Sequence, residues 1–392
     1  MRIAILANSD SWYLRDLRRA AGGARGRSRR GIPAGVPAHP RLLVANRGSR
    51  TVTVISTATN RAAKRIRVGR LPQAIAITPD YRTAYVGNGL SGTVTPIRIA
   101  TGTALAPITV GGVPAAIVIS PDGKFAYVAS GNGNNHAGTV TPIRATTNTA
   151  LAPITVGVHP LALAITPDGS ILYVLNQMSH TVTPIRTATR KALTPIPAGD
   201  NPHVLVMAPD GKTVYVAGPN DTVLPIRTAT NTAGKPIPVP GGVVLDMAIT
   251  PDGKRLYVAN FEQNVVTPVR LATRTAGKPI PLGTDSGDPP FGLAVTPNSK
   301  TVYVAAQSFV VPIRTATNKA LKPIKIGSAG AGAFAIVITP DGTMAYSANS
   351  NNGTVTPIRI ATNTALRPIR VGNRPEAIAI MPTLATLCRT CV

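Results

Sequence analysis

The chain repeats one unit of about forty residues eight times, and this repetition constrains its fold more than any other feature. Each copy closes on a Pro-Asp turn or a close variant of it, and successive turn prolines are 42 to 46 residues apart. These prolines are Pro79, Pro121, Pro167, Pro209, Pro251, Pro297, Pro340 and Pro382. A fixed period of this size indicates a stacked or radial repeat, in which one copy cannot bury its apolar face alone.

Each copy contains four short runs of strand-forming residues. In the second copy the runs are 83–86, 92–98, 106–110 and 116–120. They are rich in Val, Ile, Thr and Tyr and are bounded by Gly, Pro, Asn and Asp, which is typical of strands joined by turns. No run has the 3.6-residue period of a helix. The sequence therefore predicts an all-β fold, a single β-propeller of eight four-stranded blades, with seven blades as the alternative.

The fourth run of each copy is predicted to be the innermost strand. Runs such as 74–77, 162–165 and 377–380 alternate Ala with Ile or Leu and are apolar on both faces. A sandwich strand would instead show polar residues on one face. The repeats begin at 41–46, which matches a second strand, and end on 376–380, which matches an innermost strand. We therefore expect these two segments to pair and to close the ring.

Proline recurs at two positions in the outer half of each copy, for example at Pro96 and Pro107. Because proline is tolerated at sheet edges and bulges, we expect the outer two strands to be short and incompletely paired. The first copy has Val54 and Arg65 at these positions. Its outer sheet is therefore predicted to be the most regular.

Three short motifs carry a resemblance to a known family. They are Tyr-Val-Ala-Asn at 257–260, Thr-Pro-Asp-Gly at 250–253 and Val-Gly-Asn-Arg-Pro at 371–375. Together they resemble the YVTN β-propeller repeat of YncE-like and surface-layer proteins, over residues 41–382. The resemblance implies an extracytoplasmic or cell-surface protein without an established catalytic mechanism. The family is usually seven-bladed, whereas this chain has eight copies, and no export signal is visible in it.

The charge of the chain is strongly basic, with 41 Lys and Arg against 15 Asp and Glu, a net charge of +26. One arginine ends the third strand of seven copies: Arg98, Arg144, Arg186, Arg227, Arg270, Arg314 and Arg359. Such a rim is predicted to bind polyanions, with a plain basic surface as the alternative. Cell-wall polysaccharide is favoured over nucleic acid, because seven of the nine tyrosines share one core repeat position. Few aromatic side chains remain for base stacking.

The two ends of the chain fall outside the repeats. Residues 1–40 are expected to be a basic segment that is disordered or results from a wrongly assigned start, and 383–392 a tail. Cys388 and Cys391 form one Cys-x-x-Cys pair, which lacks the two further ligands that a metal site needs. The apolar run 3–7 is too short to span a membrane. We expect no cofactor, no bound metal and no transmembrane segment.

Polar residues precede or enter several innermost strands, where the central channel opens. His159, Asn201, His203 and Asp246 should fall on three adjacent blades, with Arg374 and Glu376 elsewhere on the same rim. Polar groups that converge on a channel mouth predict a ligand site. The alternative is that the loop histidines only face solvent.

No nucleophile motif, phosphate-binding loop or paired-carboxylate arrangement is recognisable, and the chain has only five histidines. The sequence therefore favours a monomeric, non-catalytic binding or scaffold protein, whose partner is an anionic polymer or another protein. One alternative is a lactonase-like hydrolase that uses the channel mouth. The other is a nucleic-acid-binding propeller.

Overall fold

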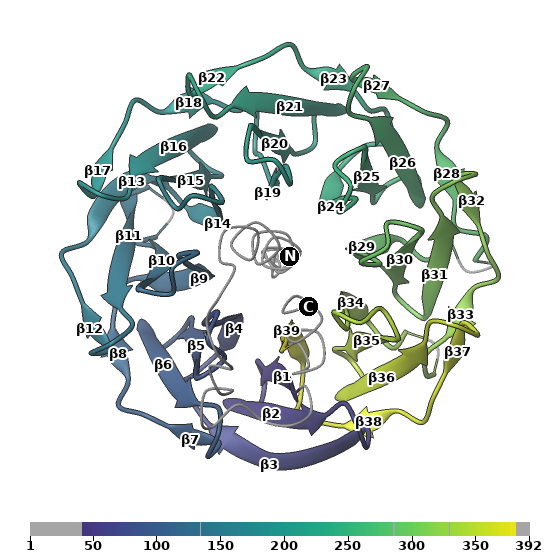
Figure 1. Ribbon diagram of the computed structural model, residues 1–392, viewed down its shortest axis with the longest axis horizontal. Helices are drawn as coiled ribbons and strands as arrows, with labels where there is room; N and C mark the ends of the chain where they lie inside the picture. Colours follow the sequence, from purple (N-terminus) through teal and green to yellow (C-terminus); the bar gives the residue numbers. More distant parts are fainter. Residues whose placement is uncertain (1–40, 134, 285–286, 329, 382–392) are drawn as a thin grey trace, which may run out of the picture.

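The computed structural model describes residues 41–133, 135–284, 287–328 and 330–381. In this part of the chain, eight antiparallel sheets form a closed ring around a central axis, and no helix is present (Figure 1). The chain is an eight-bladed β-propeller. The predicted all-β fold and the count of eight blades are confirmed. The predicted N-terminal segment 1–40 and the tail 383–392 with its two cysteines lie outside the described residues.

The innermost strand of each blade contacts the innermost strands of both neighbouring blades, which closes the ring. In the order of blades 1 to 8 these strands are β39 (Pro375–Ile380), β4 (Pro72–Ile77), β9 (Val113–Ile119), β14 (Pro160–Ile165), β19 (Val204–Met207), β24 (Val244–Ile249), β29 (Pro290–Val295) and β34 (Ala333–Ile338). Alanines such as Ala74, Ala162 and Ala377 are buried between the blades. Their small side chains allow the converging strands to approach one another.

The second and third strands form the regular part of each blade. The second strands are β1 (Arg41–Asn46), β5 (Thr83–Asn88), β10 (Phe125–Gly131), β15 (Ile171–Asn176), β20 (Thr213–Ala217), β25 (Arg255–Asn260), β30 (Thr301–Ala306) and β35 (Met344–Asn349). The third strands are β2 (Thr51–Ser56), β6 (Thr93–Arg98), β11 (Ala137–Arg144), β16 (Thr181–Arg186), β21 (Thr222–Arg227), β26 (Val265–Arg270), β31 (Phe309–Arg314) and β36 (Thr354–Arg359).

The prediction that the third strand is short and incompletely paired is wrong. In blade 2, for example, all six residues of β6 pair with β5. The carbonyl oxygen of Pro96 accepts a hydrogen bond from the Leu105 N–H at 2.8 Å, on the outer side of the strand. In an antiparallel strand the N–H and C=O of one residue point the same way, so the N–H that proline lacks would also face outward. The pairing with β5 is therefore unaffected.

The outermost strand is short, as predicted, and in seven blades it is divided into two pieces. The pieces are β7 (Thr103–Ala104) and β8 (Ile108–Thr109), β12 (Thr149–Ala150) and β13 (Ile154–Val158), β17 (Lys191–Ala192) and β18 (Ile196–Pro197), β22 (Thr232–Ala233) and β23 (Ile237–Pro238), β27 (Thr275–Ala276) and β28 (Ile280–Pro281), β32 (Lys319–Ala320) and β33 (Ile324–Lys325), and β37 (Thr364–Ala365) and β38 (Ile369–Arg370). The outer prolines, such as Pro107, lie in the gap between the pieces. Blade 1 has the single continuous strand β3 (Arg61–Arg67), so its more regular outer edge is confirmed.

Blade 1 combines both ends of the described chain. Strand β39 pairs antiparallel with β1, with Ile378 opposite Val44 and Ile380 opposite Leu42. The Met381 N–H adds a hydrogen bond of 3.0 Å to the Arg41 carbonyl. The predicted closure of the ring is confirmed, and the closed ring leaves blade 1 with a neighbour on each side.

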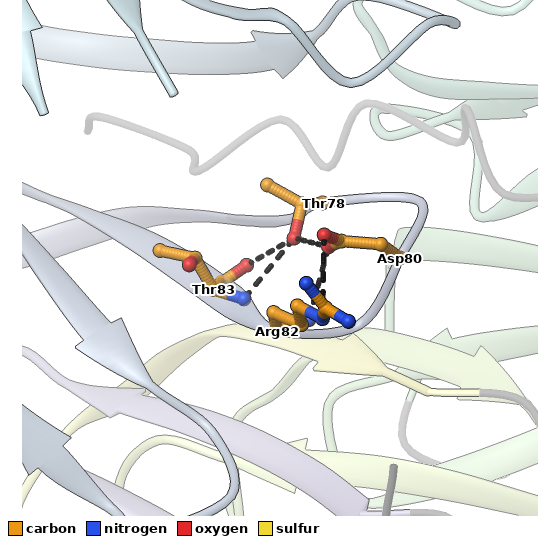
Figure 2. A network of polar contacts seen from close by, with 4 residues as sticks. All are labelled: Thr78, Asp80, Arg82 and Thr83. Carbon is orange, nitrogen blue, oxygen red and sulfur yellow. Dashed lines mark hydrogen bonds and ion pairs between the residues drawn. The ribbon is translucent and has the colours of Figure 1, made fainter. Parts of the chain in front are cut away.

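The Thr-Pro-Asp turn that follows the innermost strand of blade 2 is held by its own side chains (Figure 2). In blade 2 the Thr78 hydroxyl donates to Asp80 Oδ1 at 2.6 Å, and the backbone N–H of Arg82 donates to the same oxygen at 3.1 Å. Thr78 Oγ1 in turn accepts the Thr83 N–H at 3.1 Å. These bonds satisfy the backbone of the turn locally, so the acids of the Pro-Asp turns serve the fold.

The repeated core tyrosine links five of the blades to the next one. The hydroxyl of Tyr173 in blade 4 donates to Asn231 Oδ1 in blade 5 at 2.6 Å. Equivalent pairs are Tyr85 with Asn148, Tyr257 with Asn318, Tyr303 with Asn363 and Tyr346 with Asn60. The asparagines have positive φ angles between 51° and 55°, which this residue type tolerates. In the described residues of blade 1, Leu43 replaces the tyrosine, and Gly102 occupies the partner position in blade 2.

We expect Tyr173→Phe to lower the free energy of unfolding by about 1 to 2 kcal/mol, because Asn231 Oδ1 loses its donor while the ring still fills the core. The measurement is the urea midpoint of the purified protein. Tyr127→Phe is the matched control, because the position opposite Tyr127 holds Arg190 and no hydroxyl bond is found for Tyr127 in the described structure. Equal losses in the two variants would contradict the assigned role of the asparagine.

Candidate functional site: the channel mouth

The mouth is the end of the channel where the innermost strands begin. Seven of these strands contain a β-bulge there, so that one extra residue stands between two paired ones. His203 occupies the same position in blade 5, where its N–H and the paired Val204 both face Ala217. Around the ring from blade 1, this bulge ring consists of Glu376, Gln73, Ala115, Leu161, His203, Leu245, Phe291 and Phe334. Bulges commonly re-aim side chains beside functional sites.

The bulge ring is apolar on one side. Phe291 and Phe334 meet edge to face, with ring centroids 4.6 Å apart, and Phe261 from the turn between β25 and β26 lies 5.8 Å from Phe291. Leu245 is also buried. The polar members, His203, Glu376 and Gln73, belong to blades 5, 1 and 2. The mouth therefore offers an aromatic wall on blades 6 to 8 and separate polar groups around it.

Asp246 lies directly after the bulge of blade 6, in the wall of the channel. Its Oδ1 accepts the Met247 N–H at 2.8 Å and its Oδ2 accepts the Leu293 N–H of blade 7 at 2.7 Å. Burial among the inner strands raises the pKa of this carboxyl to about 7, although the two N–H bonds oppose the shift. The residue as a whole is partly exposed, although its carboxyl is surrounded by protein. Asp246 therefore changes its charge close to neutral pH, as groups at acid–base sites do.

His203 lies on the neighbouring blade, beside the start of β24. Burial lowers its pKa, and a hydrogen bond to the Val244 backbone partly opposes this shift. Its Nδ1 is buried and has no hydrogen-bond partner among the described residues. Burial therefore favours the neutral ring at pH 7.

Glu376 is paired with a residue that the sequence did not single out. The Arg47 Nη1 lies 3.0 Å from Glu376 Oε1, and the two side chains are 18% and 12% exposed. Burial raises the pKa of Glu376, and Arg47 and Arg374 oppose that shift. Arg374 itself is exposed, and its carbonyl accepts the Arg47 N–H at 2.9 Å. Glu376 is thus part of an ion pair across the seam where the ring closes.

His159 and Asn201 lie in the loops that precede β14 and β19. His159 Nδ1 is 2.6 Å from Gln177 Oε1, and the Asn201 N–H donates to His180 Nδ1 at 3.2 Å. The structure therefore places His159, Asn201, His203 and Asp246 on three adjacent blades without joining them into one cluster. Across the described residues, no three His, Cys, Asp or Glu side chains lie close enough together to hold a metal ion.

Residues directly after the second strand are the part of the site that the sequence analysis missed. Arg47, Gln177 and Phe261 follow the asparagine that ends β1, β15 and β25, and they contact Glu376, His159 and Phe291 in turn. The signal was present in the sequence. This position varies from copy to copy, whereas the asparagine before it recurs.

Acidic residues are concentrated on the mouth side of blades 5 to 7. Asp200, Asp221, Glu262 and Asp288 lie in mouth-side loops of this region, and Asp246 lies in the channel wall. The strand-ending rim arginines lie on the opposite face, because each third strand runs from the mouth side toward the face of the Pro-Asp turns. All seven are exposed. Their polyanion-binding role stays a prediction.

Comparison with known proteins gives a family match over part of the ring. The family model described as lactonase, 7-bladed beta-propeller, matches residues 72–197, which form blades 2 to 4. This region resembles lactonase propellers. No curated protein matches the chain.

Solved structures match over most of the ring. Dihydro-heme d1 dehydrogenase NirN, in complex with DHE, is 17% identical with a TM-score of 0.74, over 94% of this chain and 81% of that one. Hydrazine synthase from Kuenenia stuttgartiensis is 22% identical with a TM-score of 0.57, over 86% and 99%. A functionally unknown protein from Desulfotomaculum acetoxidans DSM 771 is 18% identical with a TM-score of 0.59, over 87% and 99%. These similarities support the fold alone.

The prediction of a non-catalytic binding or scaffold protein is wrong. The family match points to a lactonase propeller, so the hydrolase alternative is better supported. A shared catalytic motif is not required in this fold, because a ring of bulges can assemble a site from residues more than forty positions apart. Among the described residues, no helix is long and apolar enough to cross a membrane.

Proposed function

We propose that this propeller hydrolyses lactones at the channel mouth, with Asp246 as the general base. The observation that carries the proposal is the Asp246 carboxyl, which is held in the channel wall with a pKa of about 7. A group with this pKa is half ionised at neutral pH and can both take up and release a proton there. The lactonase match over residues 72–197 supports this class of reaction.

The proposed step adds one water molecule to a cyclic ester. Ionised Asp246 accepts a proton from the water molecule while the water oxygen attacks the carbonyl carbon of the lactone. The ring C–O bond then breaks, and the proton passes from Asp246 to the leaving alkoxide, which gives a hydroxy acid. Because Asp246 is fixed by the Met247 and Leu293 N–H groups, its position does not depend on substrate.

Other groups at the mouth would bind and orient the substrate. Each innermost strand lies at the end of its sheet and leaves one edge without a strand partner in the described structure, so backbone N–H groups face the channel. Such donors stabilise the negative charge that develops on a carbonyl oxygen. The Phe334 ring, which is partly exposed, would contact the apolar part of the substrate.

We also infer that the repeat is of the YVTN type. The inference is supported by the Tyr-Val-Ala-Asn and Thr-Pro-Asp-Gly motifs of β25 and the turn before it, together with their variants in the other copies. This subtype concerns the repeat and does not bear on the reaction.

The test is to incubate the protein with a panel of γ- and δ-lactones, from sugar lactones to alkyl-substituted ones. The measurement is the amount of acid released from each lactone over time. We expect hydrolysis that increases with pH through an apparent pKa near 7, because only ionised Asp246 accepts the proton. His180→Ala is the control, since His180 lies in a loop and binds Asp200 and Asn201. A rate equal to that of buffer for every lactone, or a rate without this pH dependence, would overturn the proposal.

A further inference from the structure

A cavity of about 130 Å³ lies between blades 6 and 7, on the face opposite the channel mouth. It is lined by Arg255, Pro268, Val269, Arg270, Thr275, Ala276, Gly277 and Asn318. Arg270, Thr275 and Gly277 are exposed, so the cavity borders the surface. Two guanidinium groups and no carboxylate belong to its lining.

One residue of the lining, Gly277, stands where most blades have a leucine. The residue that follows the first outer strand piece is a leucine in five blades: Leu105, Leu151, Leu193, Leu321 and Leu366. Blade 6 has Gly277, and an added Cβ there would first meet Pro268 Cγ at 3.2 Å. Blade 5 has Gly234 at the same position, where an added Cβ would first meet Pro225 Cγ at 3.3 Å, with the Arg274 guanidinium also within 3.8 Å. Among the described residues, only atoms of Pro268 lie within 4 Å of an added Cβ at Gly277, so no side chain takes the place of Arg274 there.

Arg255 and Arg270 are directly opposite one another on neighbouring strands. In six of the other blades the strand-ending arginine lies opposite an uncharged residue. In blade 1 the equivalent pair is Arg41 and Ser56. Like charges that face each other across strands are destabilising. An anion between the two guanidinium groups would remove this repulsion, and the cavity lies at this pair.

Arg255 is oriented toward the neighbouring blade before any ligand binds. Its Nη1 donates to Asn318 Oδ1 at 3.1 Å, and the same oxygen accepts the Tyr257 hydroxyl at 2.8 Å. The remaining N–H groups of a guanidinium can bind a planar or tetrahedral oxyanion in a bidentate manner. The fixed side chain lowers the entropy cost of binding.

We propose that the cavity between blades 6 and 7 is a binding site for a phosphate group, held by Arg255 and Arg270. The group belongs to free phosphate or to a small phosphate monoester, whose remainder would extend through the open side to solvent. The site is independent of the hydrolase proposal, since it lies on the other face and shares no residue with the mouth.

The experiment measures binding of inorganic phosphate and of a sugar phosphate to the full-length protein by calorimetry. We expect saturable binding with one site per chain. Gly277→Leu should weaken it by at least about tenfold, because the leucine of the other blades would fill the cavity without altering the fold. Arg255→Thr should weaken phosphate binding similarly, because it removes one of the two guanidinium groups. The fold should tolerate this change, since Thr83, Thr213 and Thr301 occupy the same position in other blades. Tighter binding of the sugar phosphate identifies a monoester as the ligand.

Arg359→Gln is the matched control. It removes the same strand-ending charge from blade 8 as Arg270→Gln removes from blade 6, so the net charge of the two variants is equal. We expect phosphate affinity to fall in Arg270→Gln and to be unchanged in Arg359→Gln. Equal effects would mean general attraction to a basic protein and would overturn the proposal, as would wild-type affinity in Gly277→Leu.

A stability measurement provides a second readout. In buffer without phosphate, Arg255→Thr should raise the urea midpoint, because it removes the facing pair of like charges. Phosphate should raise the midpoint of the wild-type protein and leave that of Arg255→Thr unchanged. A phosphate effect of the same size in both proteins would contradict the site.

Discussion

Removal of residues 375–392 is expected to abolish cooperative folding of the propeller. The deletion takes away strand β39, which supplies the innermost strand of blade 1. Ile378 and Ile380 lie in one core cluster with Leu42 and Tyr346, and Met381 lies in another. Truncation of one buried isoleucine to alanine typically costs about 2 to 5 kcal/mol, and the whole stability of a domain is about 5 to 15 kcal/mol. The measurement is thermal unfolding followed by circular dichroism.

A permuted chain is the control for this deletion. Residues 375–382 are moved in front of Arg41 through Asp-Gly-Lys, which rebuilds the Pro-Asp turn of the other copies. The composition of the core is then unchanged and only the order of the strands differs, so near wild-type stability is expected. A truncated protein that melts cooperatively at the wild-type temperature would show that closure by β39 is dispensable.

Asp246→Ala is expected to reduce lactone hydrolysis by about 10²- to 10⁴-fold, the usual contribution of a general base. Alanine occupies this position in five other blades, as Ala74, Ala116, Ala162, Ala335 and Ala377, so the variant should keep the fold. Glu262→Gln, which removes another carboxylate from the mouth side of blade 6, should retain activity. Full activity of Asp246→Ala would exclude Asp246 as the base.

The same substitution should change stability with a sign that depends on pH. The pKa of Asp246 is raised from 3.8 to about 7 in the folded protein, so folding favours the protonated form. The free energy of unfolding of the wild-type protein therefore decreases as pH rises from about 4 through 7. The decrease is at most about 4 kcal/mol for a fully desolvated carboxyl, and it is smaller here because Asp246 is a partly exposed residue. Asp246→Ala lacks this loss.

We therefore expect Asp246→Ala to be less stable than wild type at pH 5, where it lacks the hydrogen bonds to Met247 and Leu293. At pH 8 it should be equally or more stable, because the desolvated charge is gone. The measurement is the urea midpoint across this range. Parallel curves for the two proteins would mean that the pKa of Asp246 is not raised.

The fold could be predicted from the sequence because every copy has the same local pattern of strand-forming runs and turn residues. The Pro-Asp turns set the period, and the alternation in segments such as 377–380 identified the strand that closes the ring. The error concerned the third strand, where Pro96 suggested poor pairing. The sequence does not show whether the N–H that proline lacks would face the inner or the outer neighbouring strand. Pairing with the inner strand is lost only if the missing N–H would face it.

The candidate site was only partly predictable, because it depends on contacts between blades. The register of the copies placed His203 and Asp246 on adjacent blades. It could not reveal that Leu293 donates to Asp246, which determines where the carboxyl is held, or that Arg47 pairs with Glu376. It also could not show the bulges that bring Phe291 and Phe334 into edge-to-face contact. These features depend on burial and on residues far apart in the chain.

The location of both described chain ends in blade 1 also determines how the molecule responds to force. Arg41 and Met381 are neighbours at the same end of the β1–β39 pair. A pull on the two ends loads the hydrogen bonds of this pair one after another, as in a zipper, and not all together in shear. The ring should therefore open at low force even though its closure is expected to be essential for thermal stability, and blade 1 would be the first to separate.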